Sequence, residues 1–346
     1  MTVPPSGIAA ALHTVRHATG VVITVYFRSN DDLDAGHALV ADTVAMYLHE
    51  VADPAAVCLS VDGPGPGIAI ARRIAAATGV RMAEGSVNRG KFAALALGMR
   101  DLLQNPALTY FAAVDQDGDH FANDLLNFIR AAEHVRDQTG NDRVLVMGNR
   151  LSRHRPLGFL RAEQEELANR ILLDALTYHA AITGNPLRLH YLTTQDALPD
   201  FHAGYKVFSR PSAHAVFDHP PRTLGLPENA ALRHAIEAVM TVEAHLDGAT
   251  LAAINRRTFD EQPISLFAAL SRERLHADLI LWPCLRLGVP PHFVAQWLDN
   301  HLPALLLGTL APQGQAELVA IRNLVLRDLG LDPAQYPPPF RRPRFV

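Results

Sequence analysis

Residues 110–128 read YFAAVDQDGDHFANDLLNF, and the character of the chain changes abruptly inside this segment. Tyr110–Val114 is apolar and aromatic and too short for a helix, so the pattern predicts a buried strand. Asp115, Asp117 and Asp119 follow at alternate positions, and an amphipathic helical pattern comes after them. The segment therefore predicts a strand whose end places carboxylates at the edge of a sheet.

Adjacent carboxylates repel one another, and a hard divalent cation such as Mg²⁺ or Mn²⁺ relieves that repulsion when it lies between them and a phosphate. The segment that carries Asp115, Asp117 and Asp119 therefore predicts a metal–diphosphate site. A calcium loop of the EF-hand type is excluded, because Leu126 stands at the twelfth position counted from Asp115, where that loop needs glutamate. A solvated acidic turn that caps the next helix, with Asn123 or Asp124 as N-cap, is the other interpretation.

Composition indicates a soluble α/β protein with one large domain or two smaller ones. The chain has 346 residues, 49% of them hydrophobic and 19% charged, and its formal net charge of −4 argues against nucleic-acid binding. Cys58 and Cys284 lie far apart in apolar surroundings, which fits reduced thiols and a cytoplasmic location.

No apolar run is long enough to predict a transmembrane segment, and the N-terminus makes a poor signal peptide. Lysine occurs only as Lys91 and Lys206 in an arginine-rich, alanine-rich chain, a usage typical of a GC-rich bacterial genome.

Predicted strands alternate with predicted helices through the first half of the chain. The strands are expected at Val21–Phe27, Val57–Val61, Val80–Ala83, Tyr110–Val114, Val144–Gly148, Tyr205–Phe208 and Ala249–Ile254. The helices are expected at Gly36–Val51, Ile68–Thr78, Asn88–Leu103 (opened by Asn88-Arg89-Gly90-Lys91), Leu160–Thr183 and Ala231–Leu246. This alternation predicts a parallel, doubly wound sheet that binds its ligand at the carboxyl ends of the strands.

Five residues at or just beyond predicted strand ends are candidates for binding a nucleotide: Tyr26, Asp62, Arg89, Lys91 and Asp115. Asp62 is suited to a base or ribose, although Asp-Gly is also a common turn pair. Arg89 and Lys91 precede a helix and are suited to a diphosphate, with a solvated helix start as the alternative. The glycines between residues 63 and 67 follow neither the GxGxxG nor the P-loop order, so those two nucleotide motifs are excluded.

Two carboxylates on the predicted helix at residues 231–246 are candidate catalytic bases. A rotation of 100° per residue places Glu243 inside the apolar stripe of this helix and Glu237 near the edge of the stripe. A carboxylate in an apolar stripe must be paired or must line a cavity, so Glu243 is either catalytic or salt-bridged to Arg256 or Arg257. His120, beside the acids, is the best histidine candidate for a metal ligand.

The order of these motifs resembles the N-terminal half of GT-A fold glycosyltransferases, particularly the family 2-like group. The matching segments are VVITVYF, VDG, NRGKFAALALG and VDQDGDHFANDLL, and the resemblance covers Val21–Phe259. Asp115-Gln116-Asp117 matches the DXD motif of that group, residues 88–91 match its basic loop, and residues 203–205 match its small-Gly-aromatic segment. The resemblance implies an α/β fold with a mixed sheet of the GT-A type, a Rossmann-like nucleotide-binding half and an α-helical C-terminal subdomain.

The resemblance also implies roles for individual residues. Asp62 would contact the base or ribose, Asp115 the ribose or metal, and Asp117 the metal that bridges both phosphates, with Lys91 or Arg89 near the diphosphate. Glu237 and Glu243, which precede the last predicted strand, also make the chain similar, more distantly, to glucosylphosphoglycerate and mannosylglycerate synthases. Those enzymes bind the metal with a histidine beyond the last strand, but the corresponding INRRTFDEQP has none, so metal binding rests mainly on the aspartates, and whether Asp119 or His120 joins them stays open.

The resemblance implies a metal-dependent glycosyltransferase that moves a sugar from a UDP- or GDP-sugar to a small soluble acceptor, using Mn²⁺ or Mg²⁺. Glu237 or Glu243 would deprotonate the acceptor if the reaction inverts the anomeric centre, whereas a retaining reaction needs no such base. The alternatives are a sugar-nucleotide nucleotidyltransferase and a non-catalytic nucleotide-sugar-binding protein.

Four regions are expected: an N-terminal extension (1–20), a GT-A-like catalytic domain (21–260), a helical C-terminal subdomain (261–332) and a Pro/Arg-rich tail (333–346). The apolar run HLPALLLGTL in the third region predicts either a cover over the acceptor site or a homodimer contact through the C-terminal helices.

Overall fold

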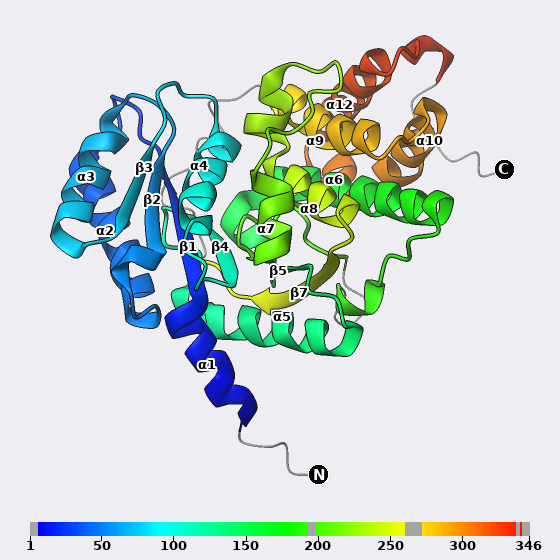
Figure 1. The fold of residues 1–346 in the computed structure, drawn as a ribbon. Coiled ribbons are helices and arrows are strands. Elements are labelled where there is room, and N and C mark those ends of the chain that lie inside the picture. The colour runs from blue at the N-terminus through cyan, green and yellow to red at the C-terminus, as the bar shows by residue number, and fades with distance from the viewer. Residues whose placement is uncertain (1–5, 193–197, 260–271, 337–339, 341–346) are drawn as a thin grey trace.

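The computed structural model of the chain describes residues 6–192, 198–259, 272–336 and 340. In these residues seven strands form one mixed sheet in the order β3-β2-β1-β4-β6-β5-β7 (Figure 1). The strands are β1 (Thr19–Val25), β2 (Val57–Val61), β3 (Arg81–Glu84), β4 (Tyr110–Asp115), β5 (Val144–Arg150), β6 (Lys206–Ser209) and β7 (Thr250–Arg256). The predicted α/β fold with a mixed sheet is confirmed.

The strand pairing is parallel except around β6. Strand β1 pairs in parallel with β2 and with β4, and β5 pairs in parallel with β7. Strand β6 is antiparallel to both of its neighbours, β4 and β5. The carboxyl ends of β1, β2, β4, β5 and β7 therefore lie at one edge of the sheet, and the chain enters β6 at that same edge.

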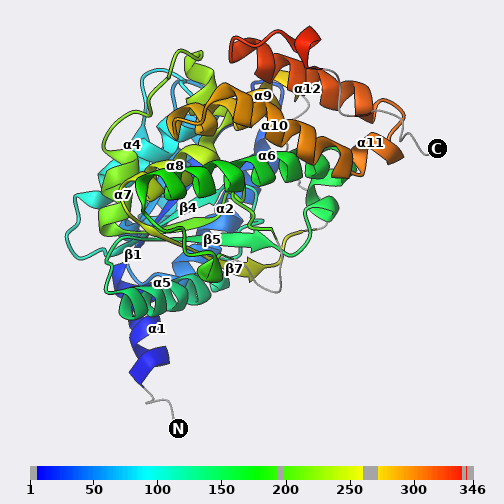
Figure 2. The same cartoon turned by 90° about the vertical axis from the view of Figure 1, so that its right-hand side faces the viewer.

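Helices cover both faces of the sheet. Those of the first half are α1 (Ser6–Ala18), α2 (Leu33–Glu50), α3 (Pro66–Thr78), α4 (Lys91–Leu103), α5 (Leu125–Thr139) and α6 (His154–Thr183, broken at Gly158). The later ones are α7 (Arg210–Phe217), the π-helix η4 (Ala230–His234), α8 (Ile236–Leu246), α9 (Arg272–Arg286), α10 (Pro291–His301), α11 (Leu307–Leu310) and α12 (Gly314–Asp328). Figure 2 shows α5 beneath the sheet, with α4, α6 and α8 above it.

The predicted elements occur, with shifted ends. Strand β1 starts and finishes two residues before the predicted Val21–Phe27, and β4 runs one residue further than predicted, to Asp115. The predicted N-terminal extension contributes α1, which packs against α5, and the first two residues of β1. Helix α7 was not predicted, because its eight residues are too few to show helical periodicity.

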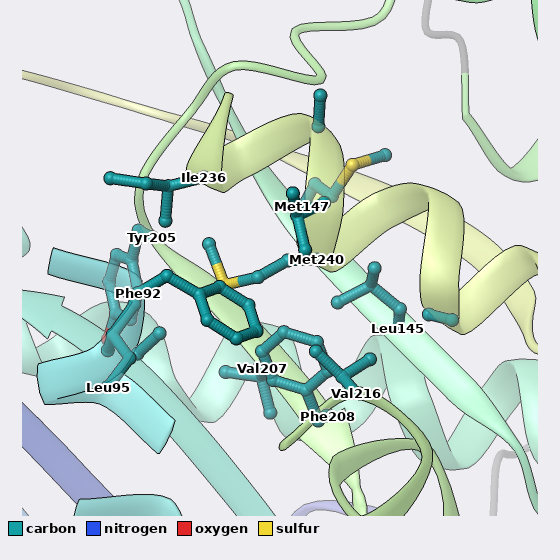
Figure 3. Close-up of a cluster of buried hydrophobic side chains, with 14 of the residues drawn as sticks. Phe92, Leu95, Leu145, Met147, Tyr205, Val207, Phe208, Val216, Ile236 and Met240 are labelled. Atoms are coloured by element: carbon teal, nitrogen blue, oxygen red, sulfur yellow. The ribbon is translucent and has the colours of Figure 1, made fainter. Parts of the chain in front are cut away.

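The core continues from the sheet into the helices that follow it. Figure 3 shows Val207 and Phe208 of β6 packed with Phe92 of α4 and with Ile236 and Met240 of α8. The same cluster of buried apolar residues extends through Trp282 of α9 to Val325 of α12. Helices of the C-terminal region pack on α6 and α8, so they share the core of the sheet domain.

The predicted boundary between the catalytic domain and the helical subdomain, at residues 260 and 261, lies outside the described residues. The apolar run HLPALLLGTL buries Leu302, Leu305 and Leu307 in the core and leaves Leu306 and Leu310 exposed. Most of its apolar content is thus used within the chain, and the homodimer contact stays a prediction. In the described parts of the chain no helix combines the length and apolarity needed to cross a membrane.

Candidate functional site

A polar pocket lies at the sheet edge where β4, β5 and β7 end. Six of the predicted residues line it, five of them being Lys91, Asp115, Asp117, Asp119 and His120. The sixth is Glu237 of α8, and Gly204 just before β6 also lines the pocket. Residues far apart in sequence meet here because parallel strands deliver their carboxyl ends to one edge.

Lys91 bridges two carboxylates in this pocket. Its ammonium lies 2.7 Å from Oδ1 of Asp115 and 3.2 Å from Oε1 of Glu237. Burial opposes the charge on Lys91, but the two carboxylates outweigh burial and raise its pKa. Burial also opposes the charge on Asp115, yet Lys91 and the neighbouring basic groups hold the pKa of Asp115 well below its usual range. Asp115 and Lys91 are therefore both charged at neutral pH.

Asp117 is a buried carboxylate in a different electrostatic position. Its Oδ1 accepts a hydrogen bond from the backbone N–H of Asp119 at 3.2 Å. Burial, and then repulsion from Asp115, raises the pKa of Asp117 to about 6. A second positive charge beside Asp115 and Asp117 would offset both the burial of the Asp117 carboxylate and its repulsion from Asp115. Two close carboxylates of this kind are the environment that a hard divalent cation prefers.

The donor set fits a cation that also has ligands from a substrate. Among the described residues, no group of three or more His, Cys, Asp or Glu side chains is arranged to hold a metal ion. Asp115 and Asp117 would hold Mg²⁺ or Mn²⁺, and phosphate oxygens and water would supply its other ligands, as is usual for nucleotide-bound metals.

Asp119 and His120 have structural partners. The Asp119 carboxylate lies 3.2 Å from the Arg256 guanidinium and accepts the backbone N–H of Phe259 at 2.6 Å. Nδ1 of His120 accepts the backbone N–H of Asp115 at 3.0 Å, and its ring stacks on Tyr205. Burial lowers the pKa of His120 well below its usual value, so the ring is neutral. These contacts fix the β4 turn that presents Asp115 and Asp117.

The other predicted nucleotide-binding residues lie around the pocket without lining it. Asp62, directly after β2, accepts backbone N–H groups of Arg89 and Gly90 and so fixes the loop before Lys91. The Arg89 side chain turns away to pair with Glu228. Tyr26, after β1, is 42% exposed, and its backbone exchanges two hydrogen bonds with the side chain of Gln116.

The placement of Glu243 corrects the expectation that it is a catalytic base. Both of its carboxylate oxygens accept hydrogen bonds from Arg286 of α9, at 2.7 and 2.8 Å, and it does not line the pocket. Glu243 does form a salt bridge, which was the alternative interpretation. Its partner is Arg286, however, and neither of the predicted arginines, Arg256 and Arg257. Helix α9 covers this face of α8, which is why the residue lies in the apolar stripe.

Four basic pocket residues were missed as site residues: Arg150, Arg161, His202 and Arg256. Arg150 and Arg256 end β5 and β7, so the signal that selected Asp115, a polar side chain at a strand end, was present for them as well. Arg150 is held by Asp200 at 2.6 Å and Glu165 at 2.6 Å, both buried. His202 precedes the Ala203-Gly204 pair, and a Cβ on Gly204 would lie 3.0 Å from Asp115, so only a small residue brings this loop against the site.

Among known proteins, similarity to this chain is found in solved structures. No family model matches the chain, and no curated protein matches it. Among solved structures, glucosyl-3-phosphoglycerate synthase from Mycobacterium tuberculosis with phosphoglyceric acid matches at 17% identity and a TM-score of 0.47, covering 84% of this chain and 87% of that chain. The same enzyme with Mn²⁺, UDP-glucose and phosphoglyceric acid has a TM-score of 0.44 at 17% identity, covering 84% and 86%. S. aureus TarS 1-349 matches at 13% identity and a TM-score of 0.40, covering 90% and 83%. These structures include one of the enzymes that the sequence resembles, and the function proposed below rests on the residues of this chain.

Proposed function

We propose that the protein is a glycosyltransferase that transfers a sugar from a nucleoside diphosphate sugar, UDP- or GDP-linked, to a hydroxyl of a small soluble acceptor. The observation that carries the proposal is the convergence of Asp115, Asp117, Lys91 and Glu237 in one polar pocket at the carboxyl edge of the sheet. Two acids, a lysine and a separate glutamate are the groups needed to hold a diphosphate and to handle the proton of an attacking hydroxyl.

Asp115 and Asp117 are the residues that would hold Mn²⁺ or Mg²⁺. When bound, the cation supplies positive charge to the departing diphosphate. Lys91, already 2.7 Å from Asp115, adds a second positive charge beside that leaving group. Asp62 keeps the residues before Lys91 in place through its two backbone hydrogen bonds, and is also the group suited to the base or ribose.

Glu237 is the candidate base for the acceptor hydroxyl. It lines the same pocket as Asp115, and its Oε1 lies 3.2 Å from the Lys91 ammonium, so a carboxylate able to accept a proton stands beside the residues that would hold the diphosphate. In an inverting reaction, the acceptor oxygen attacks the anomeric carbon, the bond to the diphosphate oxygen breaks, and the hydroxyl proton moves to the Glu237 carboxylate.

Thermal unfolding against UDP, GDP, ADP, CMP and dTDP, each with and without Mn²⁺, tests the donor site. A ligand that binds only the folded state raises the midpoint, and the proposal expects one diphosphate to do so in the presence of metal. The Asp117→Ala variant should lose this metal-dependent shift. Asp142→Ala is the matched control, because exposed Asp142 precedes β5 at the opposite edge of the sheet.

Turnover separates the proposal from its alternatives. A glycosyltransferase releases nucleoside diphosphate from the sugar nucleotide, and Asp117→Ala should abolish that release while the protein stays folded. Formation of sugar nucleotide from a nucleoside triphosphate and a sugar phosphate would identify a nucleotidyltransferase instead. Tight binding without either reaction would identify a binding protein, and absence of any diphosphate effect at millimolar concentration would refute the donor site.

A further inference from the structure

His202 brings an unused hydrogen-bond acceptor to the pocket. It lies between α6 and β6, is 6% exposed, and lines the same pocket as Asp115 and Glu237. Its Nε2 is buried and has no hydrogen-bond partner. A buried polar atom without a partner is costly, so a ligand that donates a hydrogen bond to such an atom on a pocket-lining residue gains free energy from the contact.

The tautomer of His202 follows from its neighbour Asn169. The backbone N–H of His202, which can only donate, lies 3.3 Å from Oδ1 of Asn169, so that atom is the carbonyl oxygen of the amide. The other amide atom, Nδ2, faces a carboxylate oxygen of Asp200 at 3.4 Å, which can only accept. Nδ1 of His202 lies 2.8 Å from the same Oδ1 and must therefore donate to it. Nε2 is left as a bare acceptor, with its lone pair unused.

The surroundings hold the ring in this state. Lys206, fully buried in β6, donates to the carbonyl oxygens of Phe201, at 2.8 Å, and Ala203, the residues on either side of His202. Asp200 is itself fixed by Arg150. Burial lowers the pKa of His202 to about 4, so the ring is neutral over the physiological range. A lysine, an asparagine and an ion-paired aspartate thus hold one imidazole nitrogen in a fixed position.

A metal is a poor occupant for this nitrogen, since His202 belongs to no group of three potential metal ligands among the described residues. The pocket lining carries as many basic as acidic side chains and the His202 ring is neutral, so nothing at this nitrogen selects for a positively charged ligand group. A neutral donor fits best, and hydroxyl groups are the neutral donors that a sugar carries.

The geometry points to Nε2 of His202 as the acceptor of a hydrogen bond from a hydroxyl of a sugar substrate. This assignment rests on the proposed function and deepens it, by naming a residue that distinguishes a sugar nucleotide from the bare nucleotide. The hydroxyl belongs either to the transferred sugar or to the acceptor, and the two sources give different results in binding and kinetic measurements.

Calorimetric titration of the full chain with Mn²⁺ tests the first source, with UDP and UDP-glucose, and GDP and GDP-mannose, as probes. His202→Phe keeps an aromatic ring but removes the acceptor. It should weaken sugar-nucleotide binding about three- to tenfold, the range for one neutral hydrogen bond, and leave diphosphate binding unchanged. His202→Gln, which can place an oxygen near the position of Nε2, should recover part of the loss.

His245→Phe is the matched control. His245 of α8 is equally buried, 3% exposed with an unpartnered Nε2, but does not line the pocket. Its replacement should leave both dissociation constants unchanged.

The second source is tested by turnover with glycerol and methyl α-D-glucoside as probe acceptors. If donor binding is unchanged in His202→Phe while KM for the probe acceptor rises severalfold at constant kcat, the hydroxyl belongs to the acceptor. Equal constants for His202→Phe and the wild type in both assays would overturn the assignment. Equal weakening of diphosphate and sugar nucleotide would also overturn it, because it would indicate a collapsed loop. If the wild type binds none of the probes, both this assignment and the proposed function are contradicted. If the wild type binds a probe and His202→Phe behaves like it, only the assignment of His202 is contradicted.

Discussion

Glu237 and Glu243 lie on one helix and look alike in sequence, but their surroundings give them different tasks. Glu237 faces the pocket, and its contact is the ammonium of Lys91, which it shares with Asp115. Glu243 lies against α9, where Arg286 takes both of its oxygens. A shared monodentate contact leaves carboxylate lone pairs available for a proton, whereas a bidentate pair commits both oxygens.

Replacement of Glu237 by glutamine should therefore act on turnover. The amide cannot accept a proton, so kcat for sugar transfer should fall by about 10²-fold or more, the usual contribution of a general base. Affinity for the nucleoside diphosphate should change little. Release of the diphosphate from the sugar nucleotide, measured in parallel with calorimetric binding, checks both points. Retained turnover in Glu237→Gln would indicate a reaction without a carboxylate base, as in retaining transfer.

Replacement of Glu243 by glutamine should act on stability. The side chains of Glu243 and Arg286 are 16% and 19% exposed, so the change leaves a largely buried guanidinium without its counter-charge. The free energy of unfolding should fall by about 1–3 kcal/mol, with kcat unchanged. Urea unfolding and a turnover assay on the same preparation provide the measurement. Loss of kcat without loss of stability would return Glu243 to the catalytic site.

At the scale of elements, the start of α4 is held in place by a close approach between two backbones. Gly90 precedes α4 with a φ of 127° and a ψ of 173°, a region open essentially to glycine alone. A Cβ at this position would lie 2.5 Å from the carbonyl oxygen of Leu232 in η4. Lys91 is the next residue, so this contact also sets the position of its ammonium in the pocket.

Gly90→Ala should be destabilising for two reasons, the backbone conformation and the clash with η4. We expect a loss of about 1–3 kcal/mol in the free energy of unfolding, and weaker diphosphate binding because Lys91 shifts. Gly140→Ala is the control, since Gly140 also has a positive φ, 66°, but nothing within 4 Å of its Cβ. Gly140 has a ψ of 11° and so lies in the left-handed helical region, which costs alanine less, and urea unfolding of both variants therefore measures what the Gly90 conformation and the clash with η4 add together. An equal loss in both would show that the close approach to η4 adds nothing.

The sequence predicted the elements whose signals are local. A buried apolar run followed by alternating acids gave β4 and the position of Asp115, because both features lie within a few residues. The direction of β6 had no such signal, since a four-residue strand takes its pairing from where the chain returns to the sheet. The partner of Glu243 was missed for a similar reason: Arg286 is brought to it only by the packing of α9 on α8. The role of His202 depends on Asn169 and Lys206, on two other elements, and was not visible in the sequence.

At the scale of the whole molecule, the C-terminal helices are part of the core of the sheet domain. Trp282 of α9 is fully buried, and its Nε1 donates to the carbonyl oxygen of Arg222 at 2.8 Å. Helix α9 packs on α6, α8, η4 and α12, so it joins the sheet domain to the last helices of the chain. If the chain were divided near residue 260, the apolar surfaces through which α9 packs on α6, α8 and η4 would become exposed.

The two tryptophans allow a direct test of this continuity. Both lie in the C-terminal helices, Trp282 in α9 and Trp297 in α10, so tryptophan fluorescence reports on that region, whereas far-ultraviolet circular dichroism averages over the whole chain. If one core holds both regions, the two probes should give the same midpoint and the same slope in urea, because the chain then unfolds in a single cooperative transition. The diphosphate found in the ligand panel should shift both midpoints equally, although Asp115 and Lys91 lie in the sheet domain. A fluorescence transition that precedes the dichroism transition, and that the ligand leaves in place, would instead establish the C-terminal helices as an independent folding unit.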